Sequence, residues 1–207
     1  LWDELLQVVI PKGRNIWAFA DDDSEKLNEV GRSFEFFVLP ENNEANVKKA
    51  MKDGNFFAAS KYYKTTDGVG DFDGDGNVPL VTDIKVDQKA NTITVATDPT
   101  RDCQVIEWIA DGKVIATGNT IDLNDYEKDL GCYIRFQMKG SGGVTYSQPF
   151  ELQYKGRIDK PVPSWALWVF KTEAGQKFMK FYHSHSFALG ALIAEKIRIL
   201  IEDNIKK

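Results

Sequence analysis

Histidine and cysteine are scarce in this chain of 207 residues, which contains two of each: His183, His185, Cys103 and Cys132. Catalytic triads and zinc centres need imidazole or thiolate groups beside further partners, and no Cys-His-Asp or Ser-His-Asp constellation is recognisable. The two histidines stand two positions apart in a segment of helical character, where their side chains point in different directions. We therefore expect solvated histidines on a helix surface rather than joint metal ligands.

The two cysteines leave two alternatives open. Both belong to a segment of short predicted strands, so an immunoglobulin-type disulfide and a buried thiol without a disulfide are both compatible with the pattern. That type of disulfide joins strands B and F, whereas Cys103 falls at the start of the strand that would be C. The sequence therefore favours reduced thiols.

Positive charge is not concentrated anywhere along the chain. Lysine and arginine total 26 against 31 aspartates and glutamates, which gives a net charge of −5 with scattered basic residues. Nucleic acid is therefore not an expected partner. The longest apolar runs, such as residues 187–194, are shorter than the roughly 20 residues that span a bilayer, so no membrane span is predicted. Neither a methionine nor a leader peptide opens the sequence, so we expect part of a longer or processed protein, cytoplasmic or secreted.

Apolar residues make up 43% of the chain and aromatic residues 12%, which is enough for packed cores. The first segment, residues 1–64, contains alternating signals for helices and strands. The expected elements are a helix over 1–9, strands over 15–20 and 33–40, a helix from Asn42 or Asn43 to Gly54, and a strand over 56–60. This order is typical of an α/β unit whose short strands need further strands to complete a sheet.

Three further segments follow, and together they predict an α+β fold. Residues 65–83 lose the apolar pattern and gain glycine and aspartate, as in an acidic linker. Residues 84–154 alternate in short runs between turn signals such as Asp111-Gly112, which predicts an antiparallel β-sandwich with Trp108 in its core. Residues 155–207 combine an aromatic strand with a long amphipathic helix. Its apolar face needs a cover, which the β-sandwich, the α/β unit or a second copy of the chain could supply, so a homodimer through this helix is one hypothesis.

Four carboxylates gather directly behind the predicted strand over 15–20, in the string "DDDSE" at 21–25. Two interpretations are open. A divalent metal ion holds such carboxylates together at the end of a strand, or they form a solvated acidic turn in which Ser24 caps the next segment.

Several strings resemble one family. "WDELL", "NIWAFADDDSE" and "GRSFEFFVLPENNEANVKKAMKDGNFFAAS" are similar, in order and separation, to the C-terminal end of PHP (polymerase and histidinol phosphatase) domains. "VIEWIADGKVIATG" and "CYIRFQMKGSGGVTYSQPF" resemble the β-sandwich that closes one bacterial branch of predicted metal-dependent phosphoesterases. The resemblance covers residues 1–154. It implies a truncated α/β barrel remnant in residues 1–64 and an accessory immunoglobulin-like β-sandwich in residues 84–154.

The resemblance also implies a degenerate metal site. The family carries an Asp-Asp-x-His signature, whose second Asp and His ligate a polynuclear metal centre that activates water. The matching run here is Asp22, Asp23, Ser24 and Glu25, so Glu25 replaces the His. The implied metal in the intact enzyme is Mg, Mn, Zn or Fe, and a carboxylate in place of imidazole favours the harder ions. Most ligands would come from a preceding PHP segment, which is therefore an expected partner.

A second acidic pattern is independent of that family. In "DFDGDGNV" three carboxylates occupy positions 1, 3 and 5 of a calcium loop: Asp71, Asp73 and Asp75. Asn77 falls at the carbonyl position, 7, but position 12 is Thr82 instead of the bidentate glutamate. A calcium site and a flexible linker both stay open. Bound calcium would stiffen the segment by neutralising carboxylates that otherwise repel one another.

Two functions follow from these features. The first is the C-terminal part of a PHP-type metal-dependent phosphoesterase, a hydrolase, in which this chain alone lacks most metal ligands and is not expected to be active. The second is a noncatalytic, calcium-stabilised module that binds a partner or a glycan. His-rich metal motifs upstream would separate the two, and the substrate is not readable from these residues.

Overall fold

The computed structural model describes residues 1–64, 71–153, 174 and 177, and only the backbone of residues 63, 64, 71 and 72. The chain divides into two units, Leu1–Asp159 and Lys160–Lys207, and the first holds every described strand. Apart from residues 174 and 177, the C-terminal segment lies outside the described residues. The aromatic strand, the long helix, the histidine pair and the homodimer therefore stay predictions.

Among the described helices, none has the length and apolar character needed to cross a membrane.

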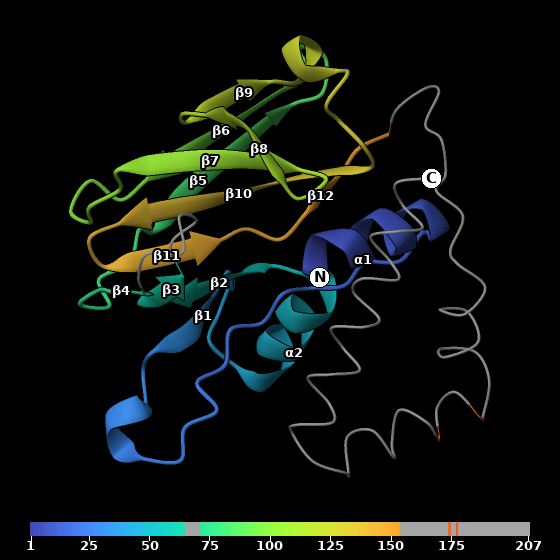
Figure 1. Cartoon of the computed structure of the whole chain (residues 1–207). Helices are drawn as coiled ribbons and strands as arrows, with labels where there is room; N and C mark the ends of the chain where they lie inside the picture. The colour runs from blue at the N-terminus through green and yellow to red at the C-terminus, as the bar shows by residue number, and fades with distance from the viewer. Residues whose placement is uncertain (65–70, 154–173, 175–176, 178–207) are drawn as a thin grey trace. The chain divides into compact units, whose positions relative to one another are not determined.

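Antiparallel sheets dominate the described part of the chain, with few helices and no closed barrel (Figure 1). The largest sheet has seven strands: β1 (Ser33–Phe37), β2 (Phe56–Ser60), β11 (Gly143–Tyr146), β10 (Tyr133–Gly140), β7 (Val105–Ala110) and β8 (Lys113–Thr117) in spatial order, with β12 (Phe150–Glu151) paired to β10. A second sheet has the order β5 (Val81–Asp87), β6 (Thr92–Thr97) and β9 (Thr120–Asp122), and a third pairs β3 (Tyr62–Lys64) with β4 (Asp71–Asp73).

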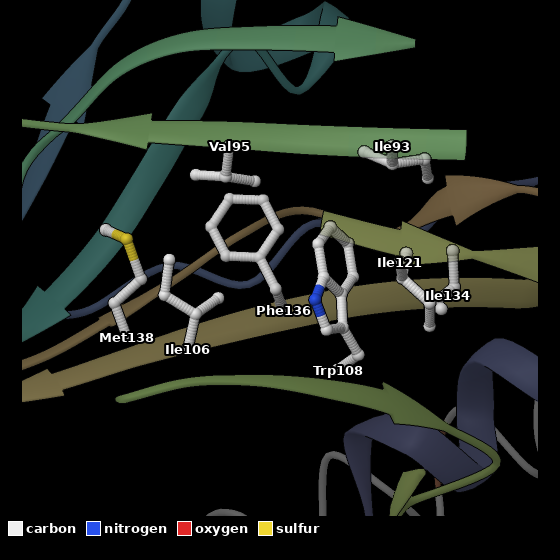
Figure 2. Packing of buried hydrophobic residues seen from close by; sticks show 8 residues of the cluster. All are labelled: Ile93, Val95, Ile106, Trp108, Ile121, Ile134, Phe136 and Met138. Carbon is white, nitrogen blue, oxygen red and sulfur yellow. The ribbon is translucent and has the colours of Figure 1, made fainter. Parts of the chain in front are cut away.

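The main core lies between the first two sheets. Because successive side chains of a strand point to opposite faces, one set of alternate residues from each sheet meets in the middle. Ile93 and Val95 of β6 lie opposite Trp108 and Phe136 in Figure 2. Trp108 is fully buried, and its indole Nε1 donates to the carbonyl of Gly118 at 2.8 Å, which confirms the predicted core residue.

The two resembling segments share one sheet. β2 pairs with β11, with Ser60 opposite Val144 and Ala58 opposite Tyr146. The further strands that residues 1–64 need therefore come from the sandwich segment. The α/β barrel remnant expected of residues 1–64 is not confirmed, because β1 and β2 form an antiparallel pair that extends the sandwich sheet.

Two α-helices occur among the described residues, α1 (Trp2–Val9) and α2 (Glu44–Asp53). The choice between two N-cap residues is settled at Asn43, whose side chain accepts the Asn46 N–H at 2.9 Å. The predicted end of α2 is confirmed at Gly54, which adopts a left-handed conformation with φ +76°. Three short 3₁₀ helices complete the described elements: η1 (Ile10–Lys12), η2 (Leu27–Glu29) and η3 (Leu123–Tyr126).

The predicted hairpin at Asp111-Gly112 is confirmed, since these two residues alone separate β7 from β8. Both have positive φ, +48° and +77°, as a type I′ turn requires. The segment 65–83, expected to be a linker, contains β4 and the first residues of β5, while residues 65–70 lie outside the described part.

Candidate functional site

The prediction of a strand over residues 15–20 is wrong, because the structure forms no strand there. Side chains take the place of a neighbouring strand and bind the backbone at every second residue. Three contacts do this: Trp2 Nε1 donates to Ile16 O at 2.9 Å, the Gln148 amide pairs with Ala18 N and O, and Glu35 Oε1 accepts the Ala20 N–H at 2.8 Å. The backbone is hydrogen-bonded at every second residue, as in a strand, but its partners are side chains and not the backbone of a neighbouring strand.

The side chains of this segment are fixed as well. Trp17 Nε1 donates to Lys52 O at 3.0 Å, and its ring lies so close to Gly54 that a Cβ there would stand 2.8 Å from ring atoms. The rings of Phe19 and Phe56 are tilted by 33°, with centroids 4.5 Å apart, although Phe19 is itself 49% exposed. The acidic residues 21–25 thus follow a segment anchored to α1, α2 and the large sheet.

Asp22, a predicted metal ligand, closes the loop that follows it. Its two carboxylate oxygens accept the backbone N–H groups of Gly31 and Ser33, each at 2.5 Å. The hydrogen bond from Ser33, followed by that from Gly31, holds the pKa of the Asp22 carboxyl below its usual range. These contacts correspond to the acidic-turn interpretation of this aspartate.

The other two predicted ligands of this run are placed by the same loop. Asp23 is left-handed, with φ +46°, a conformation that aspartate tolerates better than most residues. Its N–H makes a long contact of 3.4 Å to Asp21 Oδ1. The backbone N–H of Glu25 donates to Glu29 Oε2 at 3.1 Å, within the turn that leads into η2. Local hydrogen bonds therefore account for the shape of "DDDSE".

The described side chains do not assemble a metal centre. Within that part of the chain, no three His, Cys, Asp or Glu side chains lie together in an arrangement that holds an ion. The carboxylate of Asp22 is directed at backbone amides of its own loop. The metal that the resemblance implies therefore does not fit these residues alone.

The calcium-loop pattern lies where β4 leads into β5. Asp71 and Asp73 bound β4, and only the backbone of Asp71 is described. Asp73 Oδ1 lies 3.5 Å from the Lys61 ammonium group, and Asp75 Oδ1 accepts the Asn77 N–H at 2.8 Å. Gly76, at the sharp-turn position, has the positive φ expected there, +87°. The backbone turns at Gly76, and Lys61 contacts the carboxylate of Asp73.

The glycines of this loop have a packing role that the sequence pattern did not indicate. The N–H of Gly76 donates to Gly142 O at 3.1 Å, and that of Gly74 donates to Lys61 O at 2.7 Å. A Cβ on Gly142 would stand 2.2 Å from the carbonyl carbon of Asn77. Backbone therefore rests directly on backbone where residues 74–77 meet the β10–β11 turn, on the side of β11 where Figure 1 shows β3 and β4.

A buried ion-pair cluster was not predicted. Arg135 on β10 donates from Nε and Nη2 to the two carboxylate oxygens of Asp3 on α1, each at 2.7 Å. Tyr133 Oη donates to Asp3 at 2.7 Å and accepts the Gly112 N–H at 3.2 Å. The Arg135 guanidinium also lies over the Trp2 ring, 5.0 Å from its centroid. This cluster fixes α1 to the sandwich.

One signal in the sequence points to that cluster. In "CYIRFQM" the charged Arg135 alternates with apolar Ile134 and Phe136, so it belongs to the opposite face of β10. A charged residue in such a strand needs a counter-charge if that face is covered. The sequence does not say which distant acid supplies it, and Gln148 gives no signal at all before the fold is known.

The cysteine alternatives are resolved in favour of reduced thiols, since no disulfide joins Cys103 and Cys132. Cys132 is buried under α1, with Sγ 3.7 Å from Leu6 O. Burial, with a smaller contribution from the charge of Asp102, raises the pKa of the Cys103 thiol. This shift is opposite to the lowered pKa of a nucleophilic cysteine.

Comparisons of the chain with family models, with curated proteins and with solved structures find no match.

Proposed function

We propose that this chain is the C-terminal part of a PHP-type metal-dependent phosphoesterase, a hydrolase, and that its described residues form a noncatalytic, structural part of it. The observation that carries the noncatalytic role is the position of Asp22. Its carboxylate accepts two backbone N–H groups of its own loop, so it stabilises a turn rather than an ion. Family membership rests on the resemblance of residues 1–154.

The sheet that residues 1–64 share with the sandwich supports a structural role for the described residues. β1 and β2 extend the sandwich sheet through β11, and the buried pair of Asp3 and Arg135 ties α1 to the same sheet. A preceding catalytic segment would then fold against one firm body instead of two loosely linked domains. The metal ligands would come chiefly from that segment.

Hydrolysis of p-nitrophenyl phosphate in the presence of Mn²⁺ tests the proposal. The chain of 207 residues should show no turnover above that of a variant carrying Asp22→Asn and Asp23→Asn. The intact gene product, if it carries the upstream histidine motifs, should hydrolyse the ester. Turnover by the shorter chain that the double variant abolishes would overturn the noncatalytic role, and an inert intact product would overturn the family assignment.

One observation favours a second function, a calcium-stabilised binding module. Asp73 and Asp75 are exposed on either side of a glycine, and the loop that carries them rests on the β10–β11 turn. An ion bound there would stiffen the large sheet as well as the loop. The contact of Asp73 with Lys61 works against this function, because the lysine already neutralises part of the charge.

Calcium binding is tested by thermal unfolding and by elemental analysis after exhaustive dialysis. Calcium should raise the melting temperature of the parent chain but not that of a variant carrying Asp73→Asn and Asp75→Asn. Magnesium at the same concentration serves as the ionic-strength control. Equal responses of parent and variant would exclude this loop as the calcium site.

A further inference from the structure

Gln148 lies two residues after the end of β11 and is 8% exposed, so it is a buried polar side chain. Its Nε2 donates to the carbonyl of Ala18 at 2.8 Å, and its Oε1 accepts the N–H of the same residue at 2.9 Å. In an antiparallel sheet, two residues directly opposite each other can be joined in the same way, by one hydrogen bond to the N–H and one to the carbonyl of the same residue. One amide side chain therefore replaces a strand partner across 130 positions of sequence.

The position of Gln148 is firmly set by the residue before it. The N–H of Ser147 donates to Phe136 O at 2.9 Å, and the Phe136 N–H donates to Ser147 Oγ at 2.8 Å. Ser147 is 1% exposed and Phe136 is fully buried in the main core. The amide of Gln148 consequently follows a residue that is hydrogen-bonded to the main core.

The other anchors of this segment come from the chain's first 64 residues. Trp2 of α1 binds Ile16, and Glu35 of β1 binds Ala20. Of these three backbone anchors, Gln148 alone belongs to the sandwich segment. The acidic residues 21–25 begin three positions after Ala18.

We propose that Gln148 is a positioning residue through which the β-sandwich fixes the backbone at Ala18 and hence the start of the acidic segment 21–25. This inference deepens the proposed function and rests on it, because it assigns the accessory sandwich a role in shaping the part of the chain that would face a catalytic segment. Without the amide, Ala18 separates from the sandwich while the main core stays intact.

Amide hydrogen exchange of the 207-residue chain tests the proposal with no metal or substrate present. Gln148→Met keeps the length of the side chain and removes both hydrogen bonds, so protection of the Ala18 N–H should fall about fivefold or more. The amides of Phe136 and Met138 should keep their protection. The matched control is Gln104→Met, because Gln104 is exposed and its side chain, among the described contacts, bonds only its near neighbour Asp102. Unchanged Ala18 protection in Gln148→Met would overturn the proposal.

A conservative variant separates hydrogen bonding from space filling. Gln148→Glu retains an oxygen that accepts the Ala18 N–H, so protection there should lie closer to the parent value than in Gln148→Met. Unchanged Ala18 protection in both the glutamate and the methionine variants would show that the side chain only fills space. If Gln148→Met releases Ala18 but the intact gene product has no phosphoesterase activity, the positioning role stands and the proposed function is overturned. An active gene product in which Gln148→Met leaves Ala18 exchange unaltered would overturn the positioning role and leave the proposed function standing.

Discussion

Asp3 and Arg135 are 132 residues apart in sequence, and two hydrogen bonds of 2.7 Å join the carboxylate of one to the guanidinium of the other. Arg135 is 7% exposed, so the pair is largely removed from water. A buried ion pair of this kind adds little net stability over an apolar pair, but the loss of one partner leaves an uncompensated charge in the interior. The attachment of α1 to β10 therefore depends on both residues being present.

Replacing Asp3 by Asn should lower the free energy of unfolding by about 3 kcal/mol, because Arg135 stays buried without its counter-charge. Urea unfolding followed by tryptophan fluorescence measures the change. The control is Lys48→Met, which removes an exposed pair with Glu44 in α2 and should cost less than about 0.5 kcal/mol. Similar losses in the two variants would contradict the assignment.

The same pair predicts a dependence of stability on pH. Burial raises the pKa of the Asp3 carboxyl, but the hydrogen bond and charge of Arg135 outweigh it, so the net pKa lies below the usual 3.8. A lowered pKa in the folded state contributes stability that is complete above the unfolded pKa and is lost as the pH falls through the folded one. The difference in unfolding free energy between the parent and Asp3→Asn should therefore shrink as the pH drops below about 4. Parallel stability curves would contradict this.

Substitution of Gly142 by Ala should detach residues 74–77 from the β10–β11 turn, since the added Cβ would meet the Asn77 backbone at 2.2 Å. We expect a loss of about 3 kcal/mol, at the upper end of overpacking effects. Gly13→Ala provides the comparison, because no atom lies within 4 Å of its Cβ position and its left-handed φ of +69° costs only about 1 kcal/mol. Faster exchange of the Gly76 N–H in the Gly142 variant would confirm the local cause.

The thiols offer a chemical check of the fold. Without any reductant, the unfolded chain should react with two equivalents of Ellman's reagent, because both cysteines are reduced. In the native protein Cys132 should be the slower of the two, as it is 5% exposed, and Cys103 should react more slowly than glutathione because its raised pKa lowers the thiolate fraction. A Cys103→Ser variant isolates the slow thiol. Fewer than two equivalents in denaturant would contradict the reduced state.

Features with a local cause could be predicted from the sequence. The start of α2 at Asn43 and its end at Gly54 depend on one side chain and one left-handed residue, which act within a single turn. The β7–β8 turn at Asp111-Gly112 is equally local. Trp108 could be assigned to the core because its strand alternates in the usual way.

Features that depend on distant partners could not be predicted. Residues 15–20 have the composition of a buried strand, yet the partner that binds Ala18 is a side chain, Gln148, that follows β11. The pairing of β2 with β11 and the choice of Asp3 as the counter-charge of Arg135 are likewise set by the tertiary fold. Asp22 is a candidate metal ligand by sequence, whereas in the structure its carboxylate accepts the backbone N–H groups of Gly31 and Ser33.

The placement of β11 beside β2 has a consequence for how the chain is made. Residues 144–146 leave the ribosome after residues 58–60, with a delay on the order of ten seconds at about 5–20 residues per second. During that interval the backbone groups along one side of β2 face no neighbour, which is the situation in which nascent chains pair with one another. We therefore expect translation products that stop before residue 143 to aggregate or to bind chaperones, whereas chains that reach residue 146 supply their own strand.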